Sequence, residues 1–227
     1  MENHTTKSEK DRNLSPLTRT AVVVTNYNYG FYLDRCLRSL AVQTDKNCHV
    51  VVVDDCSDDY SHSIMDQWEH FPNFTLIRNR TNIGLGPSCN VGIRATHSRY
   101  VVRVDADDFV CADYVYMLSR FLDHTPTVDA VVCDYYCVLG DYKRELMDAV
   151  KHPIACGMMF RREVLMEIGM YPEDRGIRED VDTAKRFEIG KFRLAHLAAP
   201  LYRYNIHKGS LTNGTGANVQ PEPLAEP

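Results

Sequence analysis

Carboxylates gather at two places in the sequence, each time directly after a run of apolar residues. Asp105, Asp107 and Asp108 follow one run, and Asp54 and Asp55 follow another. Like charges held this close repel, and each raises the pKa of its neighbour unless something positive intervenes. A divalent cation is the simplest remedy, and all-oxygen ligation favours Mg²⁺ or Mn²⁺. Because these ions usually keep open positions for phosphate oxygens, the pattern predicts a phosphorylated substrate.

Each cluster also has a simpler explanation, in which the acids cap the next helix or line a solvated turn. Aspartate is common at helix caps, so for Asp54 and Asp55 both explanations stay open. A single cap needs only one acid, and the triple cluster at 105–108 therefore favours a ligand site.

The segments that position these acids alternate between strand and helix patterns. Four strand-like runs occur, at 21–24, 50–53, 74–79 and 99–104. Helical spacing of apolar residues follows them, and Pro87 is expected as the first residue of the third helix. This rhythm predicts the α/β class, with one Rossmann-like, mostly parallel sheet and helices on both faces. Ligands of such sheets bind outside the carboxyl ends of the strands, so both clusters should face one crevice.

Length and composition indicate one folded domain. The chain has 227 residues, of which 44% are hydrophobic, enough for one substantial core. Polar composition predicts a disordered lead at 1–17 and a disordered tail at 213–227. We expect a single domain over 18–212, with a nucleotide-binding half at 18–127 and a more irregular half at 128–212.

Charge and cysteine usage exclude several classes of protein. The net charge of −5 without a basic stripe argues against nucleic acid as a partner. No apolar run approaches the roughly 18 residues that a membrane helix needs, and the N-terminus lacks the apolar core of a signal peptide. Eight scattered cysteines without a CxxC pair suit a reduced, cytoplasmic chain better than a disulfide framework.

Several segments, in order along the chain, resemble the family 2 glycosyltransferases of GT-A fold. They include VVVTNYNYGFYLDRCLRSLAVQT, VVVVDDCSDD, NIGLGPSCNVGI, VDADD, ACGMMFRRE, IREDVD and LYRYNIHKGSLT. The resemblance implies a metal-dependent inverting enzyme that moves a sugar from a nucleotide-diphosphate donor to an acceptor hydroxyl. It also implies that the half at 128–212 holds the acceptor and the catalytic base.

The resemblance assigns roles to individual donor-binding residues. Thr25, Tyr27 and Asp55 match positions that hold the nucleotide base and ribose. Gly157 matches a glycine in the loop beside the donor sugar. Asp55 and Tyr27 make a uridine nucleotide the expected donor, with other bases left open.

The metal site is implied in the same way. Asp105 and Asp107 match the DxD pair of the family, which engages the ribose and a metal ion that bridges the donor diphosphate. Asp108 is expected to share in donor binding, and His207 matches a histidine that can reach the metal. We expect Asp107 to be the direct ligand of Mn²⁺ or Mg²⁺, with Asp105 on the ribose side.

Asp180 matches the catalytic base of the inverting members. A sugar hydroxyl is a poor nucleophile, so a carboxylate on the opposite face must accept its proton. Without the resemblance, the alternative is that Asp180 caps the helix-like stretch that begins there.

The resemblance further suggests a glycan or lipid-linked acceptor in cell-surface polysaccharide assembly. The protein would then be cytoplasmic, with peripheral association at the inner face of the membrane. Two alternatives stay open: a sugar nucleotidyltransferase and a non-catalytic nucleotide-sugar-binding subunit. Against the first, no Gly-rich, Lys-bearing phosphate loop lies near the first strand. Against the second, Asp105, Asp107 and Asp180 are all present.

Overall fold

A computed structural model describes residues 18–139, 143–154, 156–174 and 179–207. Both predicted disordered ends lie outside this range, as do residues 208–212 of the predicted domain. Strands and helices alternate through the first half of the chain: β1 (Thr18–Asn26), α1 (Gly30–Ala41), β2 (Cys48–Asp54), α2 (Ser61–Trp68), β3 (Phe74–Arg78), α3 (Leu85–Arg94) and β4 (Ser98–Asp105).

In the second half some strands follow one another without a helix between them. It contains β5 (Phe109–Val110), α4 (Tyr114–His124), β6 (Ala130–Leu139), β7 (Lys143–Met147), β8 (Met159–Arg161), α5 (Arg162–Glu167), α6 (Glu179–Ile189) and β9 (Leu194–Ile206).

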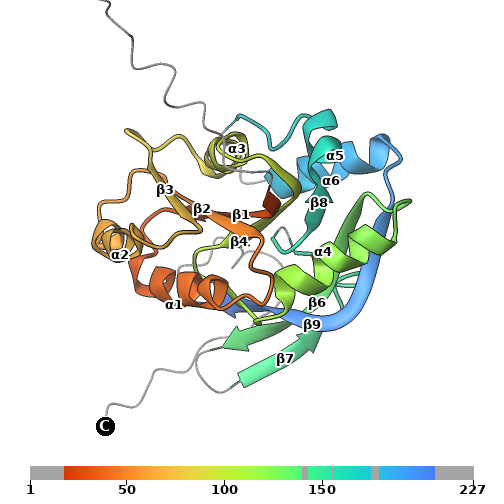
Figure 1. Ribbon diagram of the computed structural model, residues 1–227, viewed down its shortest axis with the longest axis horizontal. Coiled ribbons are helices and arrows are strands. Elements are labelled where there is room, and N and C mark those ends of the chain that lie inside the picture. Colours follow the sequence, from red (N-terminus) through yellow and green to blue (C-terminus); the bar gives the residue numbers. More distant parts are fainter. Residues whose placement is uncertain (1–17, 140–142, 155, 175–178, 208–227) are drawn as a thin grey trace, which may run out of the picture.

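The nine strands of the described residues form one sheet (Figure 1). Their order is β3-β2-β1-β4-β8-β6-β9-β5, with β7 paired to β6. The long pairings, β3 with β2, β2 with β1, β1 with β4 and β6 with β9, are parallel. The short strand β8 joins the two parallel groups through antiparallel pairing with β4 and β6. The predicted α/β class with a mostly parallel sheet is therefore confirmed.

Helices cover both faces of the sheet, because side chains on a strand alternate between the two faces. Val22 and Val24 of β1 belong to one core, together with buried residues of α1, α2 and α4. Ala21 and Val23 belong to the other core, with buried residues of α3, α5 and α6. In Figure 1, α1 and α2 lie below the first strands and α3 lies above them.

Helix α3 begins two residues earlier than predicted. It starts at Leu85 rather than at Pro87, after Gly84 in a conformation with φ of 98° that favours glycine. Pro87 is consequently the third residue of the helix. That position is still in the first turn, where a backbone N–H has no helical partner to lose.

Two expectations concern disulfide bonds and membrane-spanning helices. All eight cysteines carry free thiols, and only Cys56 is exposed, as a chain without a disulfide framework requires. Within the described ranges, no helix is both long enough and apolar enough to cross a membrane.

Candidate active site

The two acidic clusters meet at one edge of the sheet, as predicted. In the parallel register, Asn26 at the end of β1 lies opposite Asp54 at the end of β2. On the other side of β1, Thr25 lies opposite Asp105 at the end of β4. The carboxyl ends of three adjacent strands therefore bring polar side chains together at this edge.

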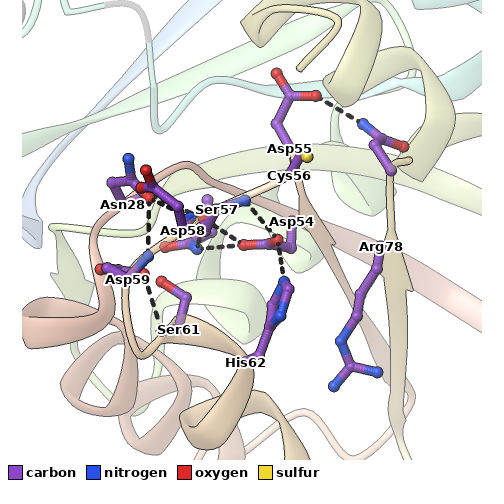
Figure 2. Close-up of polar contacts among 12 residues, drawn as sticks. Asn28, Asp54, Asp55, Cys56, Ser57, Asp58, Asp59, Ser61, His62 and Arg78 are labelled. Carbon is purple, nitrogen blue, oxygen red and sulfur yellow. Dashed lines mark hydrogen bonds and ion pairs between the residues drawn. The ribbon is translucent and has the colours of Figure 1, made fainter. Parts of the chain in front are cut away.

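Asp54 is engaged by the end of β1, by the loop after β2 and by α2 (Figure 2). The completely buried carboxylate accepts hydrogen bonds from Asn26 Nδ2 (2.7 Å), the Ser57 hydroxyl (2.6 Å) and the Ser57 N–H (3.0 Å). His62 Nε2 lies 2.9 Å from its Oδ2. Burial alone would raise the pKa of Asp54, but these partners hold that pKa below its usual value. Asp54 thus shapes the loop between β2 and α2.

Asp55 is likewise occupied by neighbouring groups of the chain. Its carboxylate accepts hydrogen bonds from Asn79 Nδ2 (2.9 Å), the Ile83 N–H (2.9 Å) and the Gly84 N–H (2.7 Å). These N–H groups directly precede α3, where a negative charge is favoured by the helix dipole. Asp55 therefore holds the loop that precedes α3, without a side-chain cap on α2 or α3, and its contact with a nucleotide base stays a prediction.

Asp105 is paired with a buried arginine on its own strand. Arg103 donates from Nε and Nη2 to the two carboxylate oxygens of Asp105, at 2.6 and 2.9 Å. Burial alone would lower the pKa of Arg103, but Asp105 outweighs this and holds it well above its usual value. The sequence interpretation missed this cation, although an arginine inside the apolar run VVRVD was a visible signal.

Asp108 anchors the end of β4 to a distant strand. Its Oδ2 accepts a hydrogen bond from the Tyr202 hydroxyl (2.6 Å), and its Oδ1 accepts one from the Asn205 N–H (2.8 Å). The Cys156 thiol donates to the same carboxylate at 3.5 Å. Burial, reinforced by Asp107 and Asp105, raises the pKa of Asp108 well above its usual value. Its predicted part in donor binding stays a prediction.

Asp107 and His207 meet at this edge although 100 residues separate them, with Asp107 Oδ2 3.0 Å from His207 Nε2. The imidazole stacks on the ring of Tyr32, with centroids 4.4 Å apart, and meets Tyr29 edge-on at 5.6 Å. Arg35 Nη2 donates to the backbone oxygen of Asp107 at 3.1 Å. The structure thus brings together the two residues predicted to bind a metal, and α1 supports them from one side.

Several buried polar atoms at this edge have no hydrogen-bond partner among the described residues. Among the described residues, Thr25 Oγ1, Arg35 Nε and Asn205 Nδ2 are buried atoms without a hydrogen-bond partner. Buried polar groups in folded proteins are nearly always paired. Five other described residues, Thr20, Asn26, Ser61, Ser98 and Tyr114, also hold such atoms, so the three groups around Asp107 and Asp105 are compatible with a polar ligand but do not by themselves mark a site.

Two further predicted residues lie close by. Tyr27 follows β1 and has 47% of its surface exposed, so its ring is accessible. Gly157 donates its N–H to the backbone oxygen of Arg103 at 3.0 Å. Its φ is 82°, and an added Cβ would lie 3.3 Å from the Tyr202 ring. Glycine is therefore needed to hold this loop against the end of β4.

Asp180 is the second residue of α6, so the predicted helix start is close to the observed one. Its side chain lies outside the described part of the structure. The helix itself is anchored by Phe187, which packs in the core shared by α3, α5 and α6.

A second group of metal-ligand-type side chains lies away from this edge. Asp134, Asp148 and His196 lie beside the irregular pairing of β6 with β9. His196 Nε2 is 2.6 Å from Asp134 Oδ1, which also accepts a hydrogen bond from the Ala149 N–H at 3.1 Å. These contacts close the segment after β7 onto the sheet.

This chain belongs to Glycosyl transferase family 2, whose sequence model matches residues 21–153. Glycosyltransferase GlyA of Streptococcus pneumoniae is 28% identical over 225 residues, a match covering 86% of this chain and 31% of GlyA. Putative glycosyltransferase EpsH of Bacillus subtilis is 26% identical over 215 residues, covering 84% of this chain and 62% of EpsH. The chain therefore spans less than two thirds of the length of these relatives.

Solved structures place the fold in the same group. TarS of Staphylococcus aureus in complex with UDP-GlcNAc matches with a TM-score of 0.71 at 22% identity, over 88% of this chain and 62% of that one. Mannosyltransferase PcManGT from Pyrobaculum calidifontis, in complex with GDP-Man and Mn²⁺, matches with a TM-score of 0.67 at 23% identity, over 87% and 61%. The fold is the GT-A fold predicted from the sequence.

Proposed function

We propose that this chain transfers a sugar from a nucleotide-diphosphate donor, with a UDP-sugar favoured, to a hydroxyl of a glycan or lipid-linked acceptor. The transfer would invert the anomeric centre and use Mn²⁺ or Mg²⁺. The observation that carries the proposal is the contact of Asp107 with His207 among unmade hydrogen bonds at the carboxyl edge of β1 and β4. Family membership and the nucleotide sugars bound by TarS and PcManGT support it.

The residues at this edge fit a divalent cation. Asp107 and His207 offer a carboxylate oxygen and an imidazole nitrogen 3.0 Å apart, a donor set that suits Mn²⁺ better than Mg²⁺. The carboxylate of Asp105 is engaged by Arg103, and that of Asp108 by β9. Asp107 and His207 would therefore hold the ion. When bound, such an ion stabilises the negative charge that develops on a leaving nucleoside diphosphate.

The chain itself would bind and orient the donor. The unpaired Thr25 Oγ1, Arg35 Nε and Asn205 Nδ2 can form hydrogen bonds with hydroxyl and phosphate oxygens. The exposed ring of Tyr27 offers a face on which a nucleotide base can stack. The loop at Gly157, which lies close against the Tyr202 ring, would flank the donor sugar.

Asp180 is assigned as the general base. The acceptor oxygen attacks the anomeric carbon on the face opposite the diphosphate, and the bond from that carbon to the phosphate oxygen breaks. The acceptor proton passes to the Asp180 carboxylate, and attack on the face opposite the leaving group would invert the anomeric centre in a single displacement. We expect this reaction in the cytoplasm, with association at a membrane surface when the acceptor carries a lipid.

The Asp180→Asn variant tests the base. We expect turnover to fall about a thousandfold, within the usual range for general-base removal, while the affinity for the nucleotide sugar is unchanged. Asp182→Asn, two residues further along α6, is the matched control and should retain wild-type turnover. Equal turnover in Asp180→Asn and the control would contradict the assignment.

A donor screen tests the proposed reaction as a whole. Release of nucleoside diphosphate is followed from a panel of UDP- and GDP-sugars, with Mn²⁺, Mg²⁺ or EDTA, in the presence of candidate glycan acceptors. A sugar nucleotidyltransferase would instead release pyrophosphate from a nucleoside triphosphate. If no sugar nucleotide binds with either metal, the proposed function is wrong.

A further inference from the structure

Arg103 is a charged residue in the middle of a buried strand. Its neighbours Val102 and Val104 are completely buried, and Arg103 itself is only 4% exposed. Arginine is almost never buried to this degree unless it is paired, because removing its charge from water is costly. Its partner is Asp105, two residues further along β4 and on the same face of the sheet.

The pairing fixes the orientation of the Asp105 carboxylate. Both oxygens accept from the guanidinium fork of Arg103, at 2.6 and 2.9 Å, so the carboxylate cannot rotate without breaking two charge-assisted bonds. A carboxylate has about four lone-pair positions, and the fork uses two of them. Asp105 can therefore still accept hydrogen bonds from a ligand, but only along fixed directions.

The two acids of the DxD pair lie against different layers of the molecule. Arg103 and Asp105 share the strand face of Val101, which belongs to the core of α3, α5 and α6. Asp107 contacts His207, which stacks on a tyrosine of α1. The fork of Arg103 thus holds one carboxylate apart from the other.

We propose that Arg103 is a positioning residue that acts through Asp105, an inference that builds on the proposed function. It presents Asp105 to the ribose hydroxyls of the nucleotide and keeps this carboxylate off the metal ion. The ion is then left to Asp107 and His207. Arg103 itself touches neither nucleotide nor metal.

Removal of Arg103 should weaken nucleotide binding without weakening metal binding. The freed Asp105 carboxylate would add a negative charge and an oxygen ligand beside Asp107, which favours the cation. The freed carboxylate could also rotate, so the ribose would lose an acceptor in a fixed position. This loss weakens nucleotide binding. A distorted site would weaken both ligands, and the effect of charge alone is separated by Arg103→Lys, which keeps the charge without the fork.

Arg103→Met is the test, and Arg161→Met is the matched control. Arg161 is also a buried arginine of the sheet, but it donates to the backbone oxygens of Leu122, Thr125 and Val128. Calorimetry measures the Kd of UDP, and of GDP in parallel, at saturating Mn²⁺. Electron paramagnetic resonance of free Mn²⁺ gives the Kd of the metal alone.

In Arg103→Met we expect the nucleotide Kd to rise about tenfold or more, while the Mn²⁺ Kd is unchanged or lower. In folded Arg161→Met both values should equal those of the wild type. A nucleotide Kd in Arg103→Met within about twofold of wild type, or a parallel loss of nucleotide and metal, would overturn the inference.

Two more variants keep the test decisive if Arg103→Met does not fold. Arg103→Lys keeps the charge without the fork and should weaken nucleotide binding by an intermediate amount. Asp105→Asn should weaken it as much as Arg103→Met, and the double variant should add nothing further. Wild-type affinities in both single variants would overturn the inference. A wild-type protein that binds neither UDP nor GDP with Mn²⁺ would instead refute the proposed function.

Discussion

The acidic ends of β2 and β4 look alike in the sequence and differ in the structure. After β2, Asp54 and Asp55 are saturated with hydrogen bonds from adjacent loops (Figure 2). After β4, each acid has a different kind of partner. Asp105 faces an arginine, Asp108 is held by β9, and Asp107 faces a histidine.

The difference teaches that a cluster of carboxylates after a strand does not by itself define a site. Asp54 and Asp55 stabilise the backbone after β2 and before α3, and base binding by Asp55 stays a prediction. Both clusters contain a carboxylate–imidazole pair, but Asp54 accepts three further hydrogen bonds, whereas the described contacts of the Asp107 carboxylate are with His207. The comparison predicts that substitutions after β4 affect ligand binding, whereas substitutions after β2 affect stability.

The largest effect is expected for Asp107→Ala. Loss of the proposed metal ligand should lower turnover by about a hundredfold or more, in line with losses from metal and electrostatic centres. The free energy of unfolding should change little, because Asp107 bonds no buried donor other than His207 in the described contacts. Turnover assays and urea unfolding check the two parts. A variant that unfolds easily but transfers sugar normally would reverse the comparison.

Asp54→Ala should have the opposite effect, a loss of stability with little change in turnover. Its removal leaves the Ser57 N–H buried without an acceptor and takes away one of the two acceptors of Asn26 Nδ2, so the free energy of unfolding should fall by about 3 kcal/mol. Asp58→Ala, an exposed position in the same loop, is the control and should change it by less than about 0.5 kcal/mol. Urea denaturation measures both. Equal free energies of unfolding in the two variants would contradict the structural role proposed for Asp54.

His207→Gln should cause a smaller loss than Asp107→Ala. Glutamine retains a polar side chain but lacks the imidazole nitrogen and the stacking on Tyr32. We expect the concentration of Mn²⁺ needed for half-maximal turnover to rise about tenfold. A metal titration of the initial rate measures this. An unchanged Mn²⁺ requirement would leave Asp107 without its proposed co-ligand.

The smallest effect is a difference in acid sensitivity at the end of β2. The pKa of Asp54 is lowered in the folded protein, so this carboxylate stabilises the fold above its unfolded pKa. The contribution is lost as pH falls through the folded pKa. The free energy of unfolding of the wild type should therefore fall more steeply below about pH 4 than that of Asp54→Asn. Denaturation at several pH values compares the slopes, and parallel slopes would contradict the assignment.

Local patterns explain how much of the molecule could be predicted from the sequence. The α/β rhythm and the shared edge of the two clusters follow from periodicity, which each segment carries on its own. The pairing of Asp107 with His207 came only from the family resemblance, because 100 residues separate the two. The anchoring of Asp108 by Tyr202 depends on the course of β9 and has no local signal.

Arg103 could be predicted in part from the sequence. Its position within an apolar run was readable, but its bond to Asp105 depends on which face of β4 is buried and against what. The predicted start of α3 at Pro87 failed for a related reason. The loop before α3 is organised by Asp55, a residue from a different strand, so the local proline rule placed the start two residues late.

The central claim is that the acidic end of β4 binds a nucleoside diphosphate with the help of a metal ion. Calorimetric titration of UDP and of GDP into the wild-type protein, once with Mn²⁺ and once with EDTA, tests it most directly. We predict that one of the two nucleotides binds in Mn²⁺ and that EDTA weakens this binding by about a hundredfold. Equal affinity with and without metal would contradict the account.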